Sequence, residues 1–182
     1  LNEVTANDRR KAKAVNFGIV YGISDFSLAQ DIKTTKKQAK QYIENYLEKY
    51  SGVREYMKNV VEKAKADEFV TTLSNRRRYL PELSSSNFIT RSFGERVALN
   101  TPIQGTAADI IKIAMVNTRR ALIAEGLKAK LILQVHDELI IEAPEEEKDT
   151  VSALLSREME NAFSLNVRLV ADTQWGRTWY EC

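Results

Sequence analysis

The opening segment, residues 7–22, carries two periodic stripes on one predicted helix. Apolar Ala12, Val15 and Ile19 recur at helical spacing, so they can supply the contact of this helix with the rest of the protein. A second stripe, spaced by four, contains two cations followed by two aromatic rings: Arg9, Lys13, Phe17 and Tyr21. Because residues at i and i+4 share a helical face, this stripe combines positive charge with flat apolar surface, which suits a nucleoside triphosphate. An amphipathic surface helix with solvated cations and core rings fits the same spacing.

Local signals set the expected ends of this helix. Asn7 or Asp8 is the predicted cap, and the helix is expected to end near Gly22. Gly18 either permits close approach of a ligand or marks an earlier end of the helix. The first alternative is favoured because the apolar period continues to Ile19. A short helix over residues 26–31 follows.

The next part predicts a helical hairpin and then two short strands. Thr34 or Thr35 caps a helix that runs to about residue 50, and Ser51-Gly52 breaks it before a helix over residues 53–66. Strands are expected over residues 69–73 and 77–80, on either side of Ser74-Asn75 and ended by Pro81. Three consecutive arginines in this region either form a solvated turn, which is slightly favoured, or clamp a phosphate: Arg76, Arg77 and Arg78.

The second half predicts a long helix and an antiparallel hairpin. After a polar linker and cap at residues 84–86, a helical pattern runs over residues 87–124, interrupted or bent at Pro102 and ended by Gly126. Branched apolar runs at residues 131–135 and 139–141 flank the turn sequence His136-Asp137-Glu138. An acidic helix over residues 146–163 and a last strand over residues 167–172 complete the prediction. The fold class is therefore α+β: a helix-rich lobe followed by a lobe with an antiparallel sheet.

Charge is distributed unevenly along the chain, although the net charge is only +2. Residues 1–100 contain 18 Lys and Arg against 12 Asp and Glu, whereas residues 101–182 contain 9 against 13. Cations concentrated in one half suit contact with phosphates, and the acidic half could hold metal ions or form a solvated face.

Composition favours a globular protein in a cytoplasmic setting. The 182 residues are 43% hydrophobic and 29% charged, and no apolar run approaches the roughly 20 residues that a membrane helix needs. No signal peptide is expected at the start. Cys182 is the only cysteine, which excludes an internal disulfide and a cysteine-based zinc site. Phosphate-cradling and dinucleotide glycine motifs are also absent from the sequence.

Three sequence strings resemble family A DNA polymerases, the bacterial DNA polymerase I group. Residues 9–22 read RRKAKAVNFGIVYG, similar to the nucleotide-binding helix of the fingers in that family. Residues 134–138, QVHDE, resemble the hairpin of the palm, and residues 95–109, ERVALNTPIQGTAAD, resemble a palm helix. The resemblance covers nearly the whole chain. It implies a fingers subdomain over residues 1–82 and a partial palm over residues 83–182.

The resemblance implies a role for each residue of the cationic and aromatic stripe. Arg9 and Lys13 are expected to contact the incoming deoxynucleoside triphosphate, and Lys13 to protonate the departing pyrophosphate. Phe17 would pack on the sugar and Tyr21 would lie near the template base. Phenylalanine at position 17 implies discrimination against dideoxynucleotides in this family.

The hairpin turn is expected to carry the catalytic carboxylates. Most Asp-Glu pairs in turns are structural or solvated, but the match to the family makes Asp137 a ligand of catalytic Mg²⁺ and Glu138 a weaker contributor. Without the match, His136 would be expected only to complete the turn, with no functional role. With it, His136 is a contact to the primer terminus.

Polar residues spaced by four on the later helix are expected to contact the duplex: Arg96, Asn100 and Gln104. Such residues are often merely exposed, but the family's matching residues touch the minor groove of the primer-template. Since acceptors at purine N3 and pyrimidine O2 occur in every Watson–Crick pair, donors there can test pairing geometry without reading sequence.

Two-ion chemistry usually draws carboxylates from more than one element. The family's other essential aspartate precedes the fingers helix, so the resemblance implies that this chain is a fragment and is inactive alone. Asp8 is explained by capping and is not assigned to the metal. The expected partners are primer-template DNA and deoxynucleoside triphosphates, with no membrane and no obligate protein partner.

Two alternative functions stay open. One is a non-catalytic module that binds nucleotides or nucleic acid, and the other is a single-subunit RNA polymerase. The sequence Asn16-Phe17-Gly18 together with Glu138 favours a DNA polymerase over an RNA polymerase.

Overall fold

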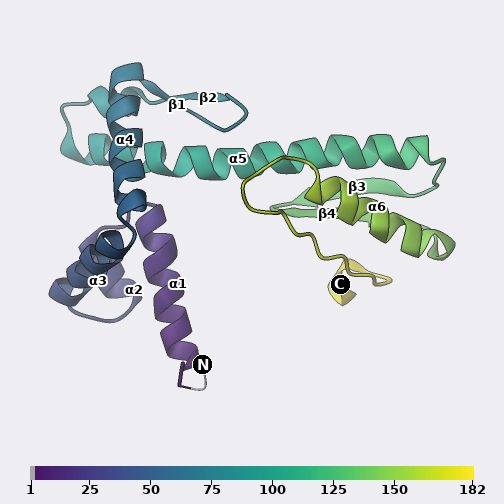
Figure 1. Ribbon diagram of the computed structural model, residues 1–182, viewed down its shortest axis with the longest axis horizontal. Coiled ribbons are helices and arrows are strands. Elements are labelled where there is room, and N and C mark those ends of the chain that lie inside the picture. The colour runs from purple at the N-terminus through teal and green to yellow at the C-terminus, as the bar shows by residue number, and fades with distance from the viewer. Residues whose placement is uncertain (1–2) are drawn as a thin grey trace. The chain divides into compact units, whose positions relative to one another are not determined.

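The computed structural model describes residues 3–182, and its elements follow the α+β pattern predicted from the sequence (Figure 1). Two compact units divide the chain, one ending at Gly105 and the other beginning at Thr106. Within the described residues, each unit contains one antiparallel sheet of two strands. No helix in residues 3–182 is long and apolar enough to cross a membrane.

Helix α1 (Ala6–Val20) begins at a reciprocal cap. Thr5 is the N-cap, its hydroxyl accepts from the backbone N–H of Asp8, and the Asp8 carboxylate accepts from the backbone N–H of Thr5. The prediction of Asn7 or Asp8 as the cap was therefore wrong, because Asp8 occupies the third helical position of the same motif. The hydrogen bonds from Thr5 lower the pKa of Asp8. Tyr21 ends the helix, and Gly22 follows with φ of 73°.

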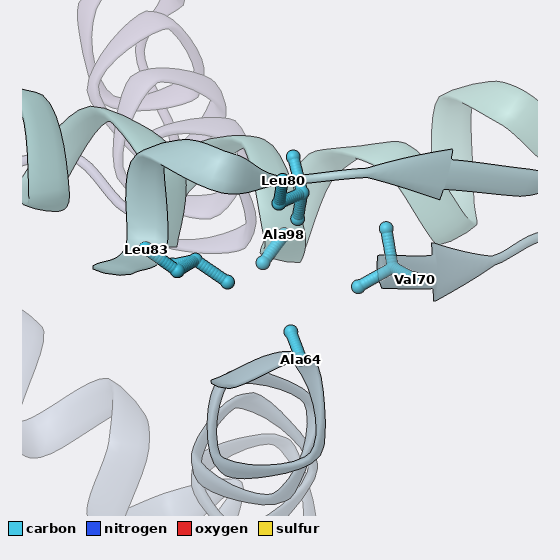
Figure 2. Close-up of a cluster of buried hydrophobic side chains, with 5 residues drawn as sticks. All are labelled: Ala64, Val70, Leu80, Leu83 and Ala98. Atoms are coloured by element: carbon cyan, nitrogen blue, oxygen red, sulfur yellow. The ribbon is translucent and has the colours of Figure 1, made fainter. Parts of the chain in front are cut away.

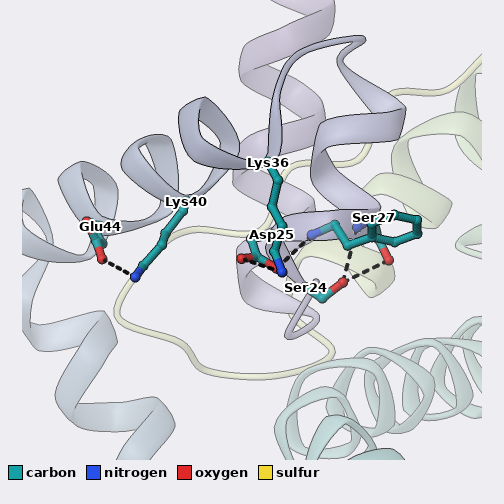
Figure 3. Close-up of polar contacts among 7 residues, drawn as sticks. Ser24, Asp25, Ser27, Lys36, Lys40 and Glu44 are labelled. Atoms are coloured by element: carbon teal, nitrogen blue, oxygen red, sulfur yellow. Dashed lines mark hydrogen bonds and ion pairs between the residues drawn. The ribbon is translucent and has the colours of Figure 1, made fainter.

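Helix α2 (Asp25–Asp31) is capped by Ser24, whose hydroxyl accepts from the backbone N–H of Ser27 at 3.1 Å. An ion pair of 3.8 Å joins Asp25 to Lys36 in the first turn of α3 (Lys36–Lys49), as Figure 3 shows. Lys40 and Glu44 form a second exposed pair along α3. Exposed pairs of this kind contribute little stability, so α1, α2 and α3 depend mainly on their apolar contact.

The apolar contact of these three helices centres on Leu28, which is completely buried. The cluster also contains Ala29, Ile32 and Ala39, with Ala14, Val15, Ile23 and Ile43 packed against it. Val15 and the buried Ile19 confirm part of the predicted apolar face of α1. Ala12 is exposed, and Ala14 contacts the cluster instead. The prediction for Ala12 was wrong because α2 and α3 cover a face turned toward Ala14.

The helical hairpin of α3 and α4 (Ser51–Asp67) is confirmed. Thr35 caps α3 with a reciprocal motif that includes Gln38. The break falls at Tyr50, whose backbone lies at φ of −110° and ψ of 62°, and Ser51 and Gly52 already belong to α4. The predicted break at Ser51-Gly52 was one residue late.

Strands β1 (Phe69–Thr71) and β2 (Arg77–Tyr79) form the predicted short hairpin, with Val70 opposite Arg78. The 3₁₀ helix η1 (Pro81–Ser84) follows. Figure 2 shows the core beneath them, in which side chains from α4, β1, η1 and the long helix α5 (Phe88–Ala124) converge. Its buried members are Ala64, Val70, Leu80, Leu83 and Ala98. This core attaches the β1–β2 hairpin to the part of α5 that lies in the first unit.

Helix α5 starts after Asn87, whose side-chain oxygen accepts from the backbone N–H of Ile89 at 2.8 Å and from that of Thr90. The cap is therefore Asn87 and not a serine of the predicted linker at residues 84–86. The helix runs through Pro102 without interruption. At its end the N–H of Gly126 bonds to the carbonyl of Ile123 and that of Leu127 to the carbonyl of Leu122, and Gly126 has φ of 68°. This pattern is a Schellman motif, which confirms the predicted stop.

The second unit contains the predicted hairpin of β3 (Lys130–Val135) and β4 (Glu138–Glu142). Its register shifts between Leu131 and Leu133, so one residue bulges out of the ladder. The 3₁₀ helix η2 (Glu145–Glu147) precedes α6 (Lys148–Glu160), which begins later and ends earlier than the predicted helix. Buried residues in two clusters join α5, the hairpin and α6: Ile111, Ala114, Leu139 and Ala162, and Leu122, Ala129, Val151 and Leu154.

The predicted last strand over residues 167–172 was wrong. The segment has no strand partner among the described residues, and Val167 and Val170 are largely exposed. Glu160 holds the segment instead: its carboxylate accepts from Arg168 at 2.7 Å and from the backbone N–H of Ala171 at 3.3 Å. Branched residues favour extended backbone, but a strand also requires a neighbour to pair with. The 3₁₀ helix η3 (Trp179–Glu181) lies near the end of the chain.

The compact units divide inside α5, whereas the predicted subdomain boundary lies near residue 83. Residues 83–105 of the predicted palm therefore pack with the first unit. The assignment of residues 1–82 to fingers and 83–182 to a partial palm stays a prediction.

Candidate nucleotide and nucleic-acid site

The stripe predicted on α1 is present as an exposed face of that helix. Arg9, Lys13 and Phe17 are all exposed, and Tyr21 at the C-cap is half-buried. The ring centroids of Phe17 and Tyr21 lie 6.2 Å apart, and the Lys13 ammonium lies 5.9 Å from the centroid of Phe17. Cation, ring and ring thus follow one another along one side of the helix.

The two cations of this stripe have no hydrogen-bond or ion-pair partner within residues 3–182. Neither the Arg9 guanidinium nor the Lys13 ammonium forms a hydrogen bond or ion pair with another residue in the described part of the chain. Their neighbour Arg10 differs, because it donates to the side chain of Asn7 at 3.0 Å. Arg9 and Lys13 therefore keep their donors available for an anion.

The aromatic end of the stripe borders an open hollow of about 610 Å³ in the first unit. Phe17, Tyr21 and Arg96 contribute to its wall together with Ser24, Ser27 and Asp31. A flat apolar surface and a nearby guanidinium suit a nucleoside, whose sugar and base are apolar on their faces and polar at their edges.

Two of the three polar residues predicted on α5, Arg96 and Gln104, lie beside this aromatic end. Gln104 is exposed, and its amide nitrogen donates to the hydroxyl of Tyr21 at 2.6 Å. Arg96 lies against Gly22, where a Cβ atom would meet its Cγ at 3.3 Å. The Oδ1 atom of Asn100 is buried and has no hydrogen-bond partner among the described residues. The structure therefore brings Tyr21, Arg96 and Gln104 together, which sequence spacing alone did not predict.

Gly18 serves the packing of the protein. The helix continues past it to Val20, so the early end considered from the sequence was wrong. A Cβ atom at Gly18 would lie 2.8 Å from the Cγ2 of Ile23, a member of the apolar contact of α1 with α2. Gly18 is thus explained by close approach of Ile23, and the ligand considered from the sequence is not needed to account for it.

The three consecutive arginines contact the protein, which neither alternative from the sequence included. Arg76 donates to the carbonyl of Gly105 at 3.0 Å, and Arg78 donates to the hydroxyl of Thr101 at 3.4 Å. The Arg77 guanidinium lies 4.7 Å from the ring centroid of Phe69. The alternation of side chains along a strand is a signal that these three residues face different sides, but it names no partner.

The tip of the β3–β4 hairpin presents its polar side chains to solvent. His136, with φ of 51°, occupies the first position of the two-residue turn, where hairpins favour left-handed backbone. The turn is tightened by Gln134, whose amide nitrogen donates to the carbonyl of His136 at 2.6 Å. His136, Asp137 and Glu138 are all exposed.

The carboxylates at this tip have no partner within the part of the chain that the structure describes. Neither Asp137 nor Glu138 forms a hydrogen bond or ion pair with another residue within the described range. Within residues 3–182 no group of three or more histidine, cysteine, aspartate or glutamate side chains is placed to hold a metal ion. Both carboxylates also line a larger hollow of about 1370 Å³ formed within the second unit.

The α1 stripe and the hairpin tip belong to different compact units. The first unit contains every predicted nucleotide-binding residue and the three polar residues of α5, and the second contains His136, Asp137 and Glu138. The predicted approach of stripe and tip stays a prediction.

The chain belongs to DNA polymerase family A, whose model matches residues 1–181. The chain is 55% identical over 179 residues to DNA polymerase I of Lactococcus lactis subsp. lactis (strain IL1403). The aligned residues cover 98% of this chain and 20% of the relative. It is 56% identical over 180 residues to DNA polymerase I of Bacillus caldotenax, again covering 20% of that protein. The chain thus spans about a fifth of the length of these relatives.

A solved structure is also similar to this chain. It is described as the POL domain of Pol1 from M. smegmatis in complex with DNA primer-template and dNTP. The TM-score is 0.93 and the sequence identity 46%, with 98% of this chain and 31% of that chain covered. The resemblance noted in the sequence is therefore confirmed at the level of family and fold.

Proposed function

We propose that this chain supplies the nucleotide-binding helix, duplex contacts and a metal-binding carboxylate of a DNA-directed DNA polymerase. The reaction adds a deoxynucleotide from its triphosphate to the 3′ end of a primer, in DNA replication and repair. Family membership and the similarity to polymerases of the DNA polymerase I type support this proposal. The description of the similar solved structure, which contains primer-template and dNTP, supports the same two partners.

One observation carries the proposal: the exposed stripe of α1 has two cations without hydrogen-bond or ion-pair partners among the described residues at one end, and two rings beside a hollow at the other. Arg9 and Lys13 lie one helical turn apart, so they can hold neighbouring phosphates of one triphosphate. Phe17 can then cover the sugar and Tyr21 the template base. A nucleoside triphosphate laid along the helix would place its phosphates at the two cations and its sugar at the Phe17 ring.

Lys13 has a second role in the proposal. Its ammonium can donate a proton to pyrophosphate as the bond to the α-phosphorus breaks. Because Phe17 lies beside this ammonium, at 5.9 Å, the ring helps to hold the lysine on the nucleotide side of the helix.

The hairpin tip would bind the cation of the reaction. Asp137 and Glu138 offer exposed carboxylate oxygens without partners among the described residues, and Mg²⁺ prefers oxygen ligands of this kind. When bound, Mg²⁺ neutralises developing charge and aligns the primer hydroxyl with the triphosphate. Asp137 would hold the ion, with Glu138 as a weaker contributor, and the remaining ligands would come from phosphate oxygens, water and further protein groups. We propose that one such ligand is a carboxylate outside this chain, so the isolated chain does not extend primers.

The duplex would be contacted from both units. Arg96, Asn100 and Gln104 would meet the minor groove of the primer-template, and His136 the primer terminus. Donors directed at acceptors common to all correct pairs sense pairing geometry. Residues 1–82 would then correspond to fingers and residues 83–182 to a partial palm, working on DNA in a bacterial cytoplasm without an obligate protein partner.

The test uses a polymerase of the relatives' length that carries these residues. Arg9→Ala and Lys13→Ala should each raise the KM for deoxynucleoside triphosphates and lower kcat/KM by about tenfold or more, because charge-assisted contacts to phosphate are lost. Arg10→Ala is the matched control, since this guanidinium binds Asn7 instead. Asp137→Asn should lower kcat on the order of a thousandfold with DNA binding retained.

Equal effects of Arg9→Ala and Arg10→Ala would contradict the proposed nucleotide face. Full extension activity of Asp137→Asn would contradict the metal role. Nucleotide and DNA binding with no activity in any polymerase that carries these residues would favour a non-catalytic binding module instead.

A further inference from the structure

The turn of the β1–β2 hairpin docks on the stretch of α5 that carries Gln104. The Arg76 guanidinium donates to the carbonyl of Gly105 at 3.0 Å, one residue from Gln104. A Cβ atom at Gly105 would lie 2.6 Å from the Cγ2 of Thr72, a residue that is only 4% exposed. Helix and hairpin therefore meet in close contact at this glycine.

A second arginine reaches the same stretch of helix from the same side of the hairpin. Arg78 donates to the hydroxyl of Thr101, which is next to Asn100, at 3.4 Å. Side chains two residues apart on a strand point to one face, so Arg76 and Arg78 both face α5. Val70 and Leu80 share that face and lie in the core beneath the hairpin. Arg77 belongs to the opposite face and lies over Phe69.

The hairpin turn is itself held in a defined shape. The N–H of Thr72 donates to the carbonyl of Arg76 at 3.0 Å, and the N–H of Arg76 donates to the hydroxyl of Thr72 at 3.2 Å. Asn75 takes left-handed backbone with φ of 61° and closes the turn. These bonds fix the backbone from which the Arg76 side chain extends, so the guanidinium approaches Gly105 from a set direction.

Helix α5 has reduced support of its own at this point. Pro102 has no N–H, so the carbonyl of Ala98 receives no helical bond from it, and Gly105 is the residue with the least helical preference after proline. Two residues separate these weak positions, and Gln104 is one of them. The hydrogen bond from Arg76 to the Gly105 carbonyl therefore supports a stretch of α5 in which helical hydrogen bonding and helix propensity are weakest.

We infer that Arg76 is a positioning residue for Gln104: its bond to the Gly105 carbonyl fixes the helical turn that presents the Gln104 amide to duplex DNA. Arg78 supports the preceding turn through Thr101 in the same way. This inference rests on the proposed contact of Gln104 with the minor groove. It assigns to two of the three arginines an effect on primer extension without contact to DNA, nucleotide or metal.

A double-mutant cycle on a polymerase of the relatives' length tests the inference. The proteins compared are the unmodified polymerase, Arg76→Ala, Gln104→Ala and the double variant. The measurements are kcat/KM for adding one nucleotide to a matched primer, the same value for a mismatched primer, and the melting temperature. If Arg76 acts through Gln104, Arg76→Ala should lower matched extension by about fivefold when Gln104 is present and by less than about twofold in Gln104→Ala.

Matched controls separate this coupling from general effects. Arg77→Ala removes the same charge from the next residue of the hairpin but leaves both contacts with α5, so its matched extension should remain within about twofold of the unmodified protein. Arg76→Lys keeps one donor and should recover part of the loss. If Arg76→Ala melts below the assay temperature, the cycle is measured with Arg76→Lys and judged by the same coupling.

The outcomes distinguish failure of the inference on Arg76 from failure of the proposed role of Gln104. Equal losses from Arg76→Ala with and without Gln104, or an equal loss from Arg77→Ala, would overturn the inference alone. Unchanged extension in Gln104→Ala would overturn the proposed role of Gln104 and the inference with it. A loss that depends on Gln104 and that Arg76→Lys partly restores would support the inference.

Discussion

The amide nitrogen of Gln104 donates a hydrogen bond to the hydroxyl of Tyr21 across 2.6 Å, joining α5 to the C-cap of α1. In the proposed function, Tyr21 lies near the template base and Gln104 contacts the duplex. The N–H of Gln104 that bonds to Tyr21 is available to DNA only when that bond breaks, while the second N–H of the amide stays available. The bond to Tyr21 on the nucleotide-binding helix therefore competes with one of the hydrogen bonds that Gln104 could donate to the duplex.

Tyr21→Phe should strengthen binding of primer-template DNA. The ring is kept and only the acceptor for Gln104 is lost, so DNA no longer competes with that bond. Since a net hydrogen bond contributes about 0.5–1.5 kcal/mol, the Kd should fall about threefold. Fluorescence anisotropy with a labelled primer-template measures the change.

The effect of Tyr21→Phe should disappear in Gln104→Ala, and an equal change in both backgrounds would contradict the competition. Tyr46→Phe is the matched control. It also removes a phenolic hydroxyl, one that donates to Asn16 at 2.6 Å, and it should leave DNA affinity unchanged.

Phe17→Tyr should raise the incorporation of dideoxynucleotides relative to deoxynucleotides. Phe17 is 49% exposed on the proposed nucleotide face, and the family resemblance implies that phenylalanine at this position discriminates against dideoxynucleotides. A ring hydroxyl adds a hydrogen-bonding group beside the sugar, for which a gain of about tenfold is expected. Competitive primer extension measures the ratio.

Phe26→Tyr, a similarly exposed phenylalanine on α2, should leave the ratio unchanged. If Phe17→Tyr also leaves it unchanged, the proposed position of the sugar on the Phe17 ring is wrong.

Leu80→Ala should destabilise the first unit by about 3 kcal/mol, since it removes a buried side chain and leaves a cavity. Leu80 is 1% exposed in the core that joins α4, the β1–β2 hairpin and α5. Chemical denaturation measures the free energy of unfolding. Leu73→Ala, at a side chain that is 62% exposed at the hairpin turn, is the control, and a similar loss from both would contradict the importance of this core.

Gly105→Ala should destabilise the protein although alanine is the better helix former. The new Cβ atom would lie 2.6 Å from the side chain of Thr72, so the hairpin must move, at a cost of about 1–3 kcal/mol. Gly52→Ala is the matched change in an exposed part of α4, where nothing lies within 4 Å, and it should stabilise by up to about 1 kcal/mol. Denaturation curves compare the two, and a stabilising Gly105→Ala would show that helix and hairpin are not in close contact.

Acid should release the segment after α6. The hydrogen bond from Arg168, followed by that from the backbone of Ala171, lowers the pKa of Glu160 from its usual 4.5. A lowered pKa in the folded state means that the stabilising contribution is complete above pH 4.5 and is lost as the pH falls through the lowered value. The hydrogen-exchange protection of the Ala171 amide should therefore decrease in that acidic range.

Glu160→Gln provides the control for this pH effect. The amide oxygen keeps an acceptor for Ala171 but has no titrating charge, so protection should be lower at neutral pH and nearly independent of pH through the same range. A variant that keeps the full pH dependence would show that another group controls the segment.

The sequence by itself determined the features that depend on neighbours within a few residues. The cap at Thr35, the stop at Gly126 and the turn at His136 follow from local backbone chemistry, and the exposed stripe of α1 follows from helical periodicity. Local signals fixed the kind of each element well, but its ends less well. Thr5 replaced the predicted caps because capping motifs overlap in a polar segment.

Only the tertiary structure decided which distant groups meet. Gln104 lies 83 residues from its partner Tyr21, and Arg76 lies 29 residues from the Gly105 carbonyl. The extended backbone near Val170 pairs with no strand among the described residues, although its branched side chains favour one. Propensity and periodicity act along the chain, whereas these contacts depend on which surfaces the packed cores bring within hydrogen-bond distance, and that distance is set by all the side chains between them.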